Sequence, residues 1–483
     1  TNFIANVLAE SNYLGSARLN NGHGDLIKTG AGTLNLGTTT VSTNNLLRGF
    51  DMIQGLTDVR EGTLRVVANN NFALGSSKSF YDGTIVRSGA TLALGSNSFG
   101  YAMNYALQEW LMFEQGSTFR VESLSGTYQS PSSHGVIDFQ GDTTVFVQTG
   151  DFYLNNSGAG YIMGAGDIIK DGGGTMNIGE YSPDYTGNLI IKQGNIRLSA
   201  IDNSSIPNAG SFTIGINDTN NRGTVMFTAW PERDGMGSTW DINQDILVQG
   251  YSIDTRLEMY GANHNDVVNF NGNIDLSNFG SNGWTVSEFR FTIEDQLESL
   301  VPQGADEFRE EEFMNINGDI SGGNKRLRTY VRQNYYGGTY VQRMEPVPGA
   351  QVTNEANIMA FFTFSGTNTG WTGSLEIGNR QGTDVTAAGP DQDKQHFVRF
   401  GKNDGAATMA IGASNSVVLR HDATLQAYGS QVTIGNLFSD GSEGGDGYFG
   451  QQLVTNSFLE NGGTTAGSFT INQTSNRVFN AVI

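Results

Sequence analysis

The sequence predicts an all-β fold of the β-solenoid class, in which short parallel strands stack as successive coils. Three observations support this prediction. The stretch GDLIKTGAGTLNLG at residues 24–37 returns almost unchanged as GDIIKDGGGTMNIG at residues 166–179. Gly accounts for 65 of the 483 residues and Pro for only 8, which favours tight turns over proline-rich linkers. The repeated phrases follow one another without helical crossovers, as in stacked coils.

Each copy of the repeated stretch contains two short runs of apolar and polar residues divided by glycines. The runs are too short for helices, and a glycine at the break supplies the positive φ that a sharp corner requires. We therefore expect a strand, a corner and a second strand. At least one glycine of each pair, Gly30/Gly32 and Gly172/Gly174, should have a backbone conformation that Ala cannot adopt.

Related phrases continue along most of the chain, which extends the solenoid prediction beyond the two copies. They are VREGTLRVV (59–67), VRSGATLALG (86–95), FEQGSTFRV (113–121), YTGNLIIKQGNIRLS (185–199), GSFTIG (210–215), WTGSLEIG (371–378) and AGSFTIN (466–472). Apolar residues in phase should stack into an interior column, while Asn and Thr form ladders at corners. The residues expected to point inward are Leu34, Leu36, Leu64, Val66, Leu92, Leu94, Met176, Ile178, Ile196 and Leu198.

The phrases at 24–37, 59–95 and 166–199 resemble the passenger-associated (autotransporter-associated) β-strand repeat of large bacterial surface proteins. This resemblance implies a right-handed parallel β-helix exposed at the cell surface of a Gram-negative-type bacterium. Two departures are the missing C-terminal membrane domain and the closing VFNAVI, which lacks a terminal aromatic residue. We therefore expect a passenger, a fragment, or a surface protein exported by another route.

Composition excludes several partner classes. The 27 Lys and Arg residues against 48 Asp and Glu residues give a formal charge of -21, which should repel nucleic acids and anionic membranes. The chain has no Cys, so it forms no disulfides and has no thiol nucleophiles or thiolate metal ligands. Its strongest apolar run, IMAFFTF at 358–364, is too short for a membrane span. Because the sequence begins at Thr1 rather than Met, we expect processing of an exported precursor.

Changes in repeat pattern and charge along the sequence predict three segments. They are a solenoid at 1–276 with the clearest repeats, an insertion at 277–356, and a continued repeat region at 357–483. The insertion is acidic at 293–313 and rich in Arg and Tyr at 324–344. It should protrude from the coils as a solvated hairpin or helical excursion, or serve as a contact patch. The patch would contain Arg326, Arg328, Tyr330, Arg332, Tyr335, Tyr336 and Tyr340.

No catalytic, cofactor-binding or metal-binding residue is assigned from the sequence. Asp440, Glu443 and Asp446 lie on a Gly-rich stretch, and DQDK occupies 391–394, but neither matches a calcium-loop spacing. GAGDIIKDGGG lacks the G-K-[ST] end of a phosphate loop. Ordinary loop or surface roles are expected for the histidines, and strand-face packing is expected for two tryptophans that could otherwise stack on sugars. These residues are His23, His134, His264, His396, His421, Trp230 and Trp371.

The favoured functional hypothesis is a non-enzymatic extracellular structural protein that forms part of a bacterial surface filament, stalk or layer. The segments NFIANVL (2–8) and RVFNAVI (477–483) are similar apolar strands, so we expect either head-to-tail self-association into a homopolymer or continuation of a longer chain. A glycan-binding adhesin is the alternative. A β-helix polysaccharide lyase or hydrolase is the second alternative, because the 48 acids leave a carboxylate pair on an exposed sheet open.

Overall fold

The computed structural model confirms the all-β prediction for the part of the chain that it describes. None of the described residues is helical. They are 3–9, 12–14, 25–36, 55–66, 74, 83–94, 106–107, 110–122, 132–133, 135–155, 161–179, 181–198, 206–216, 224–229, 239–250, 254–260, 266–280, 288–296, 309–334, 357–378, 395–403, 415–419, 423–438 and 458–474. No helix within these ranges is long and apolar enough to cross a membrane.

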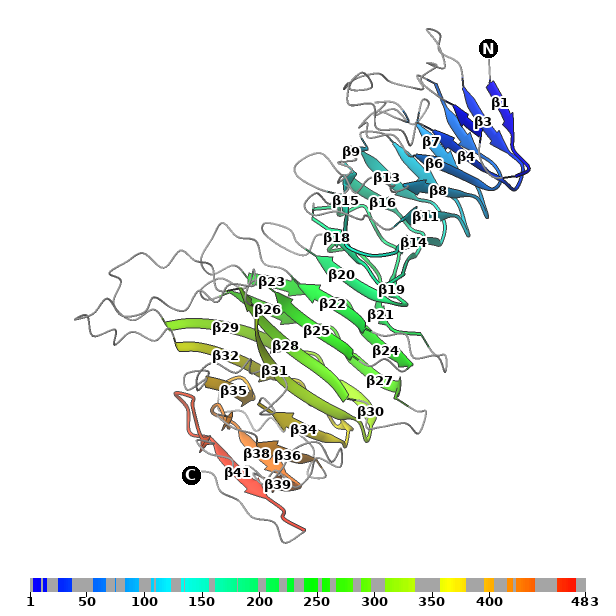
Figure 1. The fold of residues 1–483 in the computed structure, drawn as a ribbon. Coiled ribbons are helices and arrows are strands. Elements are labelled where there is room, and N and C mark those ends of the chain that lie inside the picture. The colour runs from blue at the N-terminus through cyan, green and yellow to red at the C-terminus, as the bar shows by residue number, and fades with distance from the viewer. Residues whose placement is uncertain are drawn as a thin grey trace, which may run out of the picture. The chain divides into compact units, whose positions relative to one another are not determined.

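The chain divides into two compact units, one formed by 1–216 with 222–227 and the other by 217–221 with 228–483. The strand pairings among the described residues of both units are parallel (Figure 1). Strands that neighbour one another in a sheet belong to successive coils, so each sheet is one face of a coil stack. This is the arrangement predicted for a β-solenoid.

Three sheets, A, B and C, form the faces of the first unit. Sheet A contains β1 (Phe3–Asn6), β3 (Leu26–Thr29), β5 (Thr57–Val59), β7 (Thr84–Val86), β10 (Leu111–Phe113), β13 (Val136–Phe139) and β16 (Tyr161–Gly164). Sheet B contains β2 (Asn12–Leu14), β4 (Thr33–Leu36), β6 (Thr63–Val66), β8 (Thr91–Leu94), β11 (Thr118–Val121), β14 (Thr143–Val147), β17 (Ile168–Asp171), β19 (Leu189–Ile191) and β21 (Phe212–Ile214). Sheet C contains β9 (Ala106–Leu107), β12 (Ser132–Ser133), β15 (Asp151–Asn155), β18 (Thr175–Ile178), β20 (Gly194–Leu198) and β22 (Thr224–Ala229).

The second unit has its own strands of sheets B and C and a further sheet, D. Its sheet B strands are β24 (Ile246–Gly250), β27 (Ile274–Phe279), β30 (Ile320–Gly323) and β33 (Gly370–Trp371). Its sheet C strands are β25 (Asp254–Tyr260), β28 (Glu288–Gln296), β31 (Arg326–Asn334), β34 (Ser374–Ile377), β36 (Ser416–Leu419) and β39 (Asn436–Phe438). Sheet D contains β23 (Thr239–Ile242), β26 (Val267–Phe270), β29 (Arg309–Ile316), β32 (Asn357–Phe364), β35 (Gln395–Phe400), β37 (Ala423–Gln426) and β40 (Phe458–Glu460), and β38 (Gln431–Ile434) pairs with β41 (Ser468–Ile471).

The interior of each unit is a set of apolar columns. All ten residues predicted to point inward are at most 2% exposed. In the first unit, aromatic rings extend these columns from coil to coil: Phe113 stacks on Phe139 with centroids 5.7 Å apart, and Phe119 meets Phe152 edge-on at 5.3 Å. Since alternate residues of a strand face opposite sides, the short apolar–polar alternation of each phrase was enough to predict this burial.

The two copies of the repeated stretch turn different corners of the coil. In the first copy, β3 lies in sheet A and β4 in sheet B, whereas in the second copy β17 lies in sheet B and β18 in sheet C. Gly30 and Gly172 begin the two corners with φ of +77° and +80°, the left-handed region expected for one glycine of each pair. The stretch therefore specifies a strand, a corner and a second strand, but it does not specify which two sheets of the coil these strands join.

The expectation of a protruding insertion at 277–356 is wrong for the described residues of that segment. β28 and β31 pair in continuous register from Glu288↔Arg326 to Gln296↔Asn334, and β29 pairs with β32 over its whole length. The charges that suggested an excursion alternate with apolar residues such as Phe289, Phe291 and Leu327, which are fully buried. β28 and β31 therefore continue the coils, with charged residues on one side and apolar residues such as Phe289 and Leu327 on the other, and the buried Glu312 on β29 is an exception to this pattern.

Candidate functional site

The aspartate that opens the repeated stretch joins its coil to the next coil. The Asp167 carboxylate accepts a hydrogen bond from the backbone N–H of Asn188 at 2.9 Å, and Asp25 accepts one from Leu56 at 3.1 Å. The same contact precedes and follows Asp167, because Asp142 accepts from the Asp167 N–H at 3.1 Å and Asn188 accepts from the Ser211 N–H at 2.8 Å. A Gly-Asp, Gly-Asn or Gly-Ser pair thus marks each of these consecutive corners.

The second unit repeats this ladder with a further row of amides beside it. Asn273 donates its N–H to Asp245 at 2.8 Å and accepts from the N–H of Asp319 at 3.1 Å. In the neighbouring row, Asn317 donates its side-chain amide to Asn271 at 2.8 Å, and Asn271 donates to Asn243 at 2.8 Å. Asn side chains can donate and accept together, so one residue type bonds to the coil before and the coil after.

Glycines between the two rows allow the coils to approach. A Cβ placed on Gly272 would lie 2.0 Å from the carbonyl oxygen of Gln244, and one on Gly318 would lie 2.0 Å from that of Gly272. Real Cβ atoms do not come so close to a carbonyl oxygen, so only Gly fits at these corners. The phrase N-[FI]-N-G-[ND] is therefore a corner signature of this unit.

The lysine of each repeated stretch is buried inside its corner. Lys170 donates from Nζ to the carbonyl oxygens of Asp171, Gly172 and Gln193 at 2.9, 2.7 and 3.0 Å. Lys28 makes the equivalent bonds to Thr29, Gly30 and Glu61 at 2.9, 2.6 and 2.9 Å. Both side chains are 0% exposed. Two acceptors belong to the lysine's own corner and one to the next coil, so the ammonium joins neighbouring coils.

Burial dominates the electrostatics of these lysines. It lowers the pKa of Lys170 to about 7, while the negative charge of Asp171 opposes the change. Burial also lowers the pKa of Lys28, and the Glu61 carboxylate opposes that fall. Three carbonyl acceptors match the three N–H donors of an ammonium group, so hydrogen bonding favours the charged form that desolvation disfavours.

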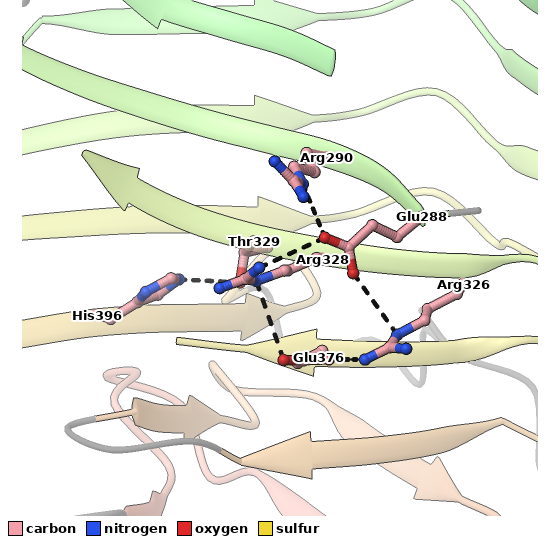
Figure 2. Close-up of polar contacts among 7 residues, drawn as sticks. All are labelled: Glu288, Arg290, Arg326, Arg328, Thr329, Glu376 and His396. Carbon is pink, nitrogen blue, oxygen red and sulfur yellow. Dashed lines mark hydrogen bonds and ion pairs between the residues drawn. The ribbon is translucent and has the colours of Figure 1, made fainter. Parts of the chain in front are cut away.

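A network of arginines and glutamates lies on sheet C of the second unit (Figure 2). Glu288 on β28 accepts from Arg290 at 2.7 Å and from Arg328 at 3.4 Å, and it forms an ion pair with Arg326 at 3.8 Å. Glu376 on β34 bonds to Arg326 and lies 4.0 Å from Arg328. The side chains of Arg328 and Glu376 are only 6% and 1% exposed.

The register explains why these charges must lie together. Arg290, Arg328 and Glu376 are opposite one another on three successive strands, and Glu288 is opposite Arg326. Like charges directly opposite on neighbouring strands repel, and Arg290 and Arg328 would do so without Glu288 between their guanidinium groups. The two carboxylates balance most of the positive charge of the three arginines, which makes this network a coil-to-coil clamp.

His396 on β35 is buried in the interior, so the expected loop or surface role is wrong for this residue. Its Nε2 lies 2.9 Å from the Thr329 hydroxyl, and its ring stacks on Phe362 with centroids 5.0 Å apart. Burial, helped by the positive charge of Arg328, lowers the pKa of His396 to about 3. The imidazole is neutral at physiological pH and fills the core as a hydrogen-bonded packing residue.

Two aspartates on the outer face of sheet A differ in the groups that balance their negative charge. Asp58 is bonded to Arg60 and to Arg87, each at 2.8 Å. Burial raises the pKa of the Asp58 carboxyl, but the hydrogen bonds and charges of Arg87 and Arg60 outweigh it and lower the pKa. Asp138 has a single side-chain partner, Gln140 at 2.7 Å, and burial raises the pKa of its carboxyl.

Several residues singled out from the sequence fall inside the described ranges. The predicted contact patch is not an exposed surface at Arg328 and Tyr330, whose side chains lie in or beside the glutamate–arginine network, with the guanidinium carbon 5.0 Å from the Tyr330 ring centre. Tyr330 is only 7% exposed. Trp371 is buried and donates its indole N–H to the Lys325 carbonyl at 2.7 Å. Packing, the expected role, is what the structure shows for Trp371.

The other candidates lie outside the described residues. This group comprises His23, His134, His264, His421, Trp230, Tyr335, Tyr336, Tyr340, Asp440, Glu443, Asp446 and residues 391–394, together with the Arg332 side chain. Among the residues that are described, no group of three or more His, Cys, Asp and Glu side chains could hold a metal ion.

A scan against protein-family models, a search of curated proteins and a search of solved structures each returned no match. The functional interpretation therefore depends on the geometry of the coils.

The expected ladder of Asn side chains is present at the Asn271 corner, but sequence reasoning missed the lysines and glutamates that also join the coils. Lys28 and Lys170 occupy the same place in both copies of the stretch, and that coincidence was the available signal for a shared structural role. Glu288 and Glu376 lie 88 positions apart by number and share no phrase. Only the register of sheet C brings them to the same arginines.

Proposed function

We propose that this chain is a non-enzymatic structural protein of the bacterial cell surface, a right-handed parallel β-helix that serves as a scaffold in a filament, stalk or layer. One observation carries the proposal. The polar groups of its recurring phrases are engaged from coil to coil, through the ladder at Asp167, the ladder at Asn273 and the Lys170 corner. Side chains arranged in this way resist separation of the coils, which is what a scaffold requires.

The surface location is supported by sequence features. The recurring phrases resemble the passenger-associated repeat of bacterial surface proteins, and a chain with no Cys folds without disulfide pairing outside the cell. A formal charge of -21 favours solubility at an exposed location. None of these features requires a small-molecule substrate.

The second part of the proposal is that the chain assembles into a homopolymer. Among the described strands, β1 is at the end of sheet A and pairs with β3. Ile4 on β1 is 64% exposed and Leu8 is 79% exposed. A strand edge flanked by exposed apolar side chains is a template for pairing with a strand of another chain. We propose that a second copy stacks head-to-tail on this edge.

Sedimentation of the purified chain tests the assembly. We expect concentration-dependent polymers from the wild-type chain and folded monomers after removal of residues 1–10 or after Ile4→Lys. Tyr181→Lys is the matched control, because Tyr181 is also a large exposed side chain, at 57%, but lies away from β1. Polymers that form equally in all variants, or in none including wild type, would contradict head-to-tail stacking through β1.

The scaffold role itself has a separate test. A β-helix scaffold should show a single cooperative unfolding transition or two, one for each unit, and no selective retention of polysaccharides. A glycan array probed with the intact chain checks this. Selective binding to one class of glycan, abolished by changes at surface aromatic residues, would replace the scaffold with an adhesin.

A further inference from the structure

One outward-facing column of sheet A contains two Asp residues with different neighbours. The register aligns Ile27, Asp58 and Ile85 on β3, β5 and β7. Three coils later it aligns Met112, Asp138 and Met163 on β10, β13 and β16. Residues on both sides of each Asp along its strand, such as Ile137 and Phe139, are fully buried, so the column faces away from the interior.

The two aspartates are equally buried but not equally neutralised. Asp58 is 2% exposed and Asp138 is 3% exposed. The charge of Asp58 is balanced by the guanidinium groups of Arg60 and Arg87. Among the described residues Asp138 has no cationic partner, and the one side-chain hydrogen bond it makes with them joins Oδ2 to the Gln140 amide. A buried carboxylate without a countercharge is costly.

The second carboxylate oxygen of Asp138 is an unpartnered acceptor. Oδ1 is buried and has no hydrogen-bond partner. It points to the side of β16, because a Cβ built on Gly164 would lie 2.9 Å from it. Gly164 has no side chain there, and it directly follows Met163. The free oxygen is therefore next to the strand that supplies one of the two methionines.

We propose that Met112, Asp138 and Met163 form a binding site for a soft monovalent metal cation, of which Cu(I) is the natural example. The two thioether sulfurs and Asp138 Oδ1 supply three ligands from three adjacent strands. Neighbouring strands of a sheet are about 4.8 Å apart, and Met has three rotatable side-chain bonds, so both sulfurs can reach a cation beside the central carboxylate.

The ligand set distinguishes this site from one for a hard cation. Thioethers select soft ions such as Cu(I), whereas Ca²⁺ takes six to eight oxygen ligands and Mg²⁺ demands octahedral oxygen coordination. The cation also supplies the positive charge that Arg60 and Arg87 give to Asp58. The neighbours in the column differ in the same way. Ile27 and Ile85 flank Asp58, which arginines neutralise, whereas two methionines flank Asp138.

Access to the site is compatible with reversible binding. Met112 and Met163 are both half-buried, so part of each residue is open to solvent, whereas Asp138 is buried. A cation can enter past the methionines without any separation of the coils. The interior packing of Phe113 and Phe139 on the other side of the sheet is unaffected.

Titration with Ag(I), a redox-inert soft cation, tests the proposal on the intact chain. We expect one tight equivalent, with the methyl carbon resonances of Met112 and Met163 shifting first. Met112→Leu with Met163→Leu keeps the side-chain volume and should weaken binding at least tenfold, as should Asp138→Asn. Met226→Leu is the control, because Met226 is another half-buried methionine outside the column.

Competition with a Cu(I) chelator under reducing conditions gives the second measurement, and it should rank the variants as Ag(I) does. Thermal unfolding without metal checks that each variant folds. Tight binding that survives the double methionine substitution, or that Met226→Leu abolishes equally, would overturn the proposal. Absence of any tight equivalent in the folded wild-type chain would overturn it as well.

Discussion

Nζ of Lys170 lies 2.7 Å from the carbonyl oxygen of Gly172, the glycine whose φ of +80° turns the chain from sheet B to sheet C. Lys28 and Gly30 have the same relationship at 2.6 Å, at the corner from sheet A to sheet B. At each corner three backbone carbonyl oxygens converge on the lysine Nζ. The buried ammonium satisfies them.

Replacing this lysine should therefore destabilise the first unit. Lys170→Met keeps much of the apolar stem but leaves three buried carbonyl oxygens without their donor, and we expect a loss of about 1–3 kcal/mol in the free energy of unfolding. Lys192→Met is the control, since Lys192 is half-exposed and makes no such bonds through Nζ among the described contacts. Denaturant unfolding measures both, and equal losses would contradict the role of the corner lysine.

The pKa of Lys170 predicts a pH dependence with a definite sign. The pKa of Lys170 in the folded chain is about 7, against an ordinary lysine value of 10.5, so between these values the unfolded chain binds more protons than the folded chain. Stability should therefore rise as pH increases from about 7 to about 10. The difference in unfolding free energy between wild type and Lys170→Met, measured at several pH values, isolates this contribution. A difference that stays constant with pH would show that the three carbonyl groups keep the ammonium charged.

Because the corner glycines are closely packed, replacing one of them with Ala should lower the free energy of unfolding. In Gly187→Ala the new Cβ would lie 2.1 Å from the carbonyl oxygen of Gly166, and a backbone neighbour cannot move aside without separating the coils. We expect a loss of at least about 1–3 kcal/mol in the free energy of unfolding. Gly173→Ala is the control, because its Cβ would meet nothing nearer than 3.6 Å. Equal melting shifts for the two variants would contradict this account of the corner.

The glutamate–arginine network predicts a large effect of neutralising Glu376. Glu376→Gln removes one of the two carboxylates that balance Arg326 and Arg328, so the buried guanidinium of Arg328 keeps only Glu288 as a neighbouring carboxylate in this network. A loss of about 3–5 kcal/mol is expected for one partner of a buried ion pair. The matched control is Glu122→Gln, whose partner Arg65 is 26% exposed and where a loss of at most about 1 kcal/mol is expected. Thermal or denaturant unfolding of the unit that contains each substitution, the second for Glu376→Gln and the first for Glu122→Gln, checks the contrast.

The sequence by itself determined the strand–corner–strand unit and the residues that line the interior. These features are local, because alternation over four residues sets which side chains are buried and a glycine sets the corner. The same local signal was present in the segment 277–356, where Phe289, Phe291 and Leu327 alternate with charged residues. Reading its charge density instead of this alternation produced the wrong expectation of a protruding insertion.

Only the tertiary structure decided which strands stack, and with them the coil-to-coil contacts. Identical phrases occupy different faces, since the length of each coil sets the register and that length varies along the chain. Glu376 meets Arg328, and Asp138 lies between Met112 and Met163, through pairings of residues 25 to 48 positions apart by number. No local pattern specifies such pairings, because they follow from the stacking of whole coils rather than from the conformation of any single strand.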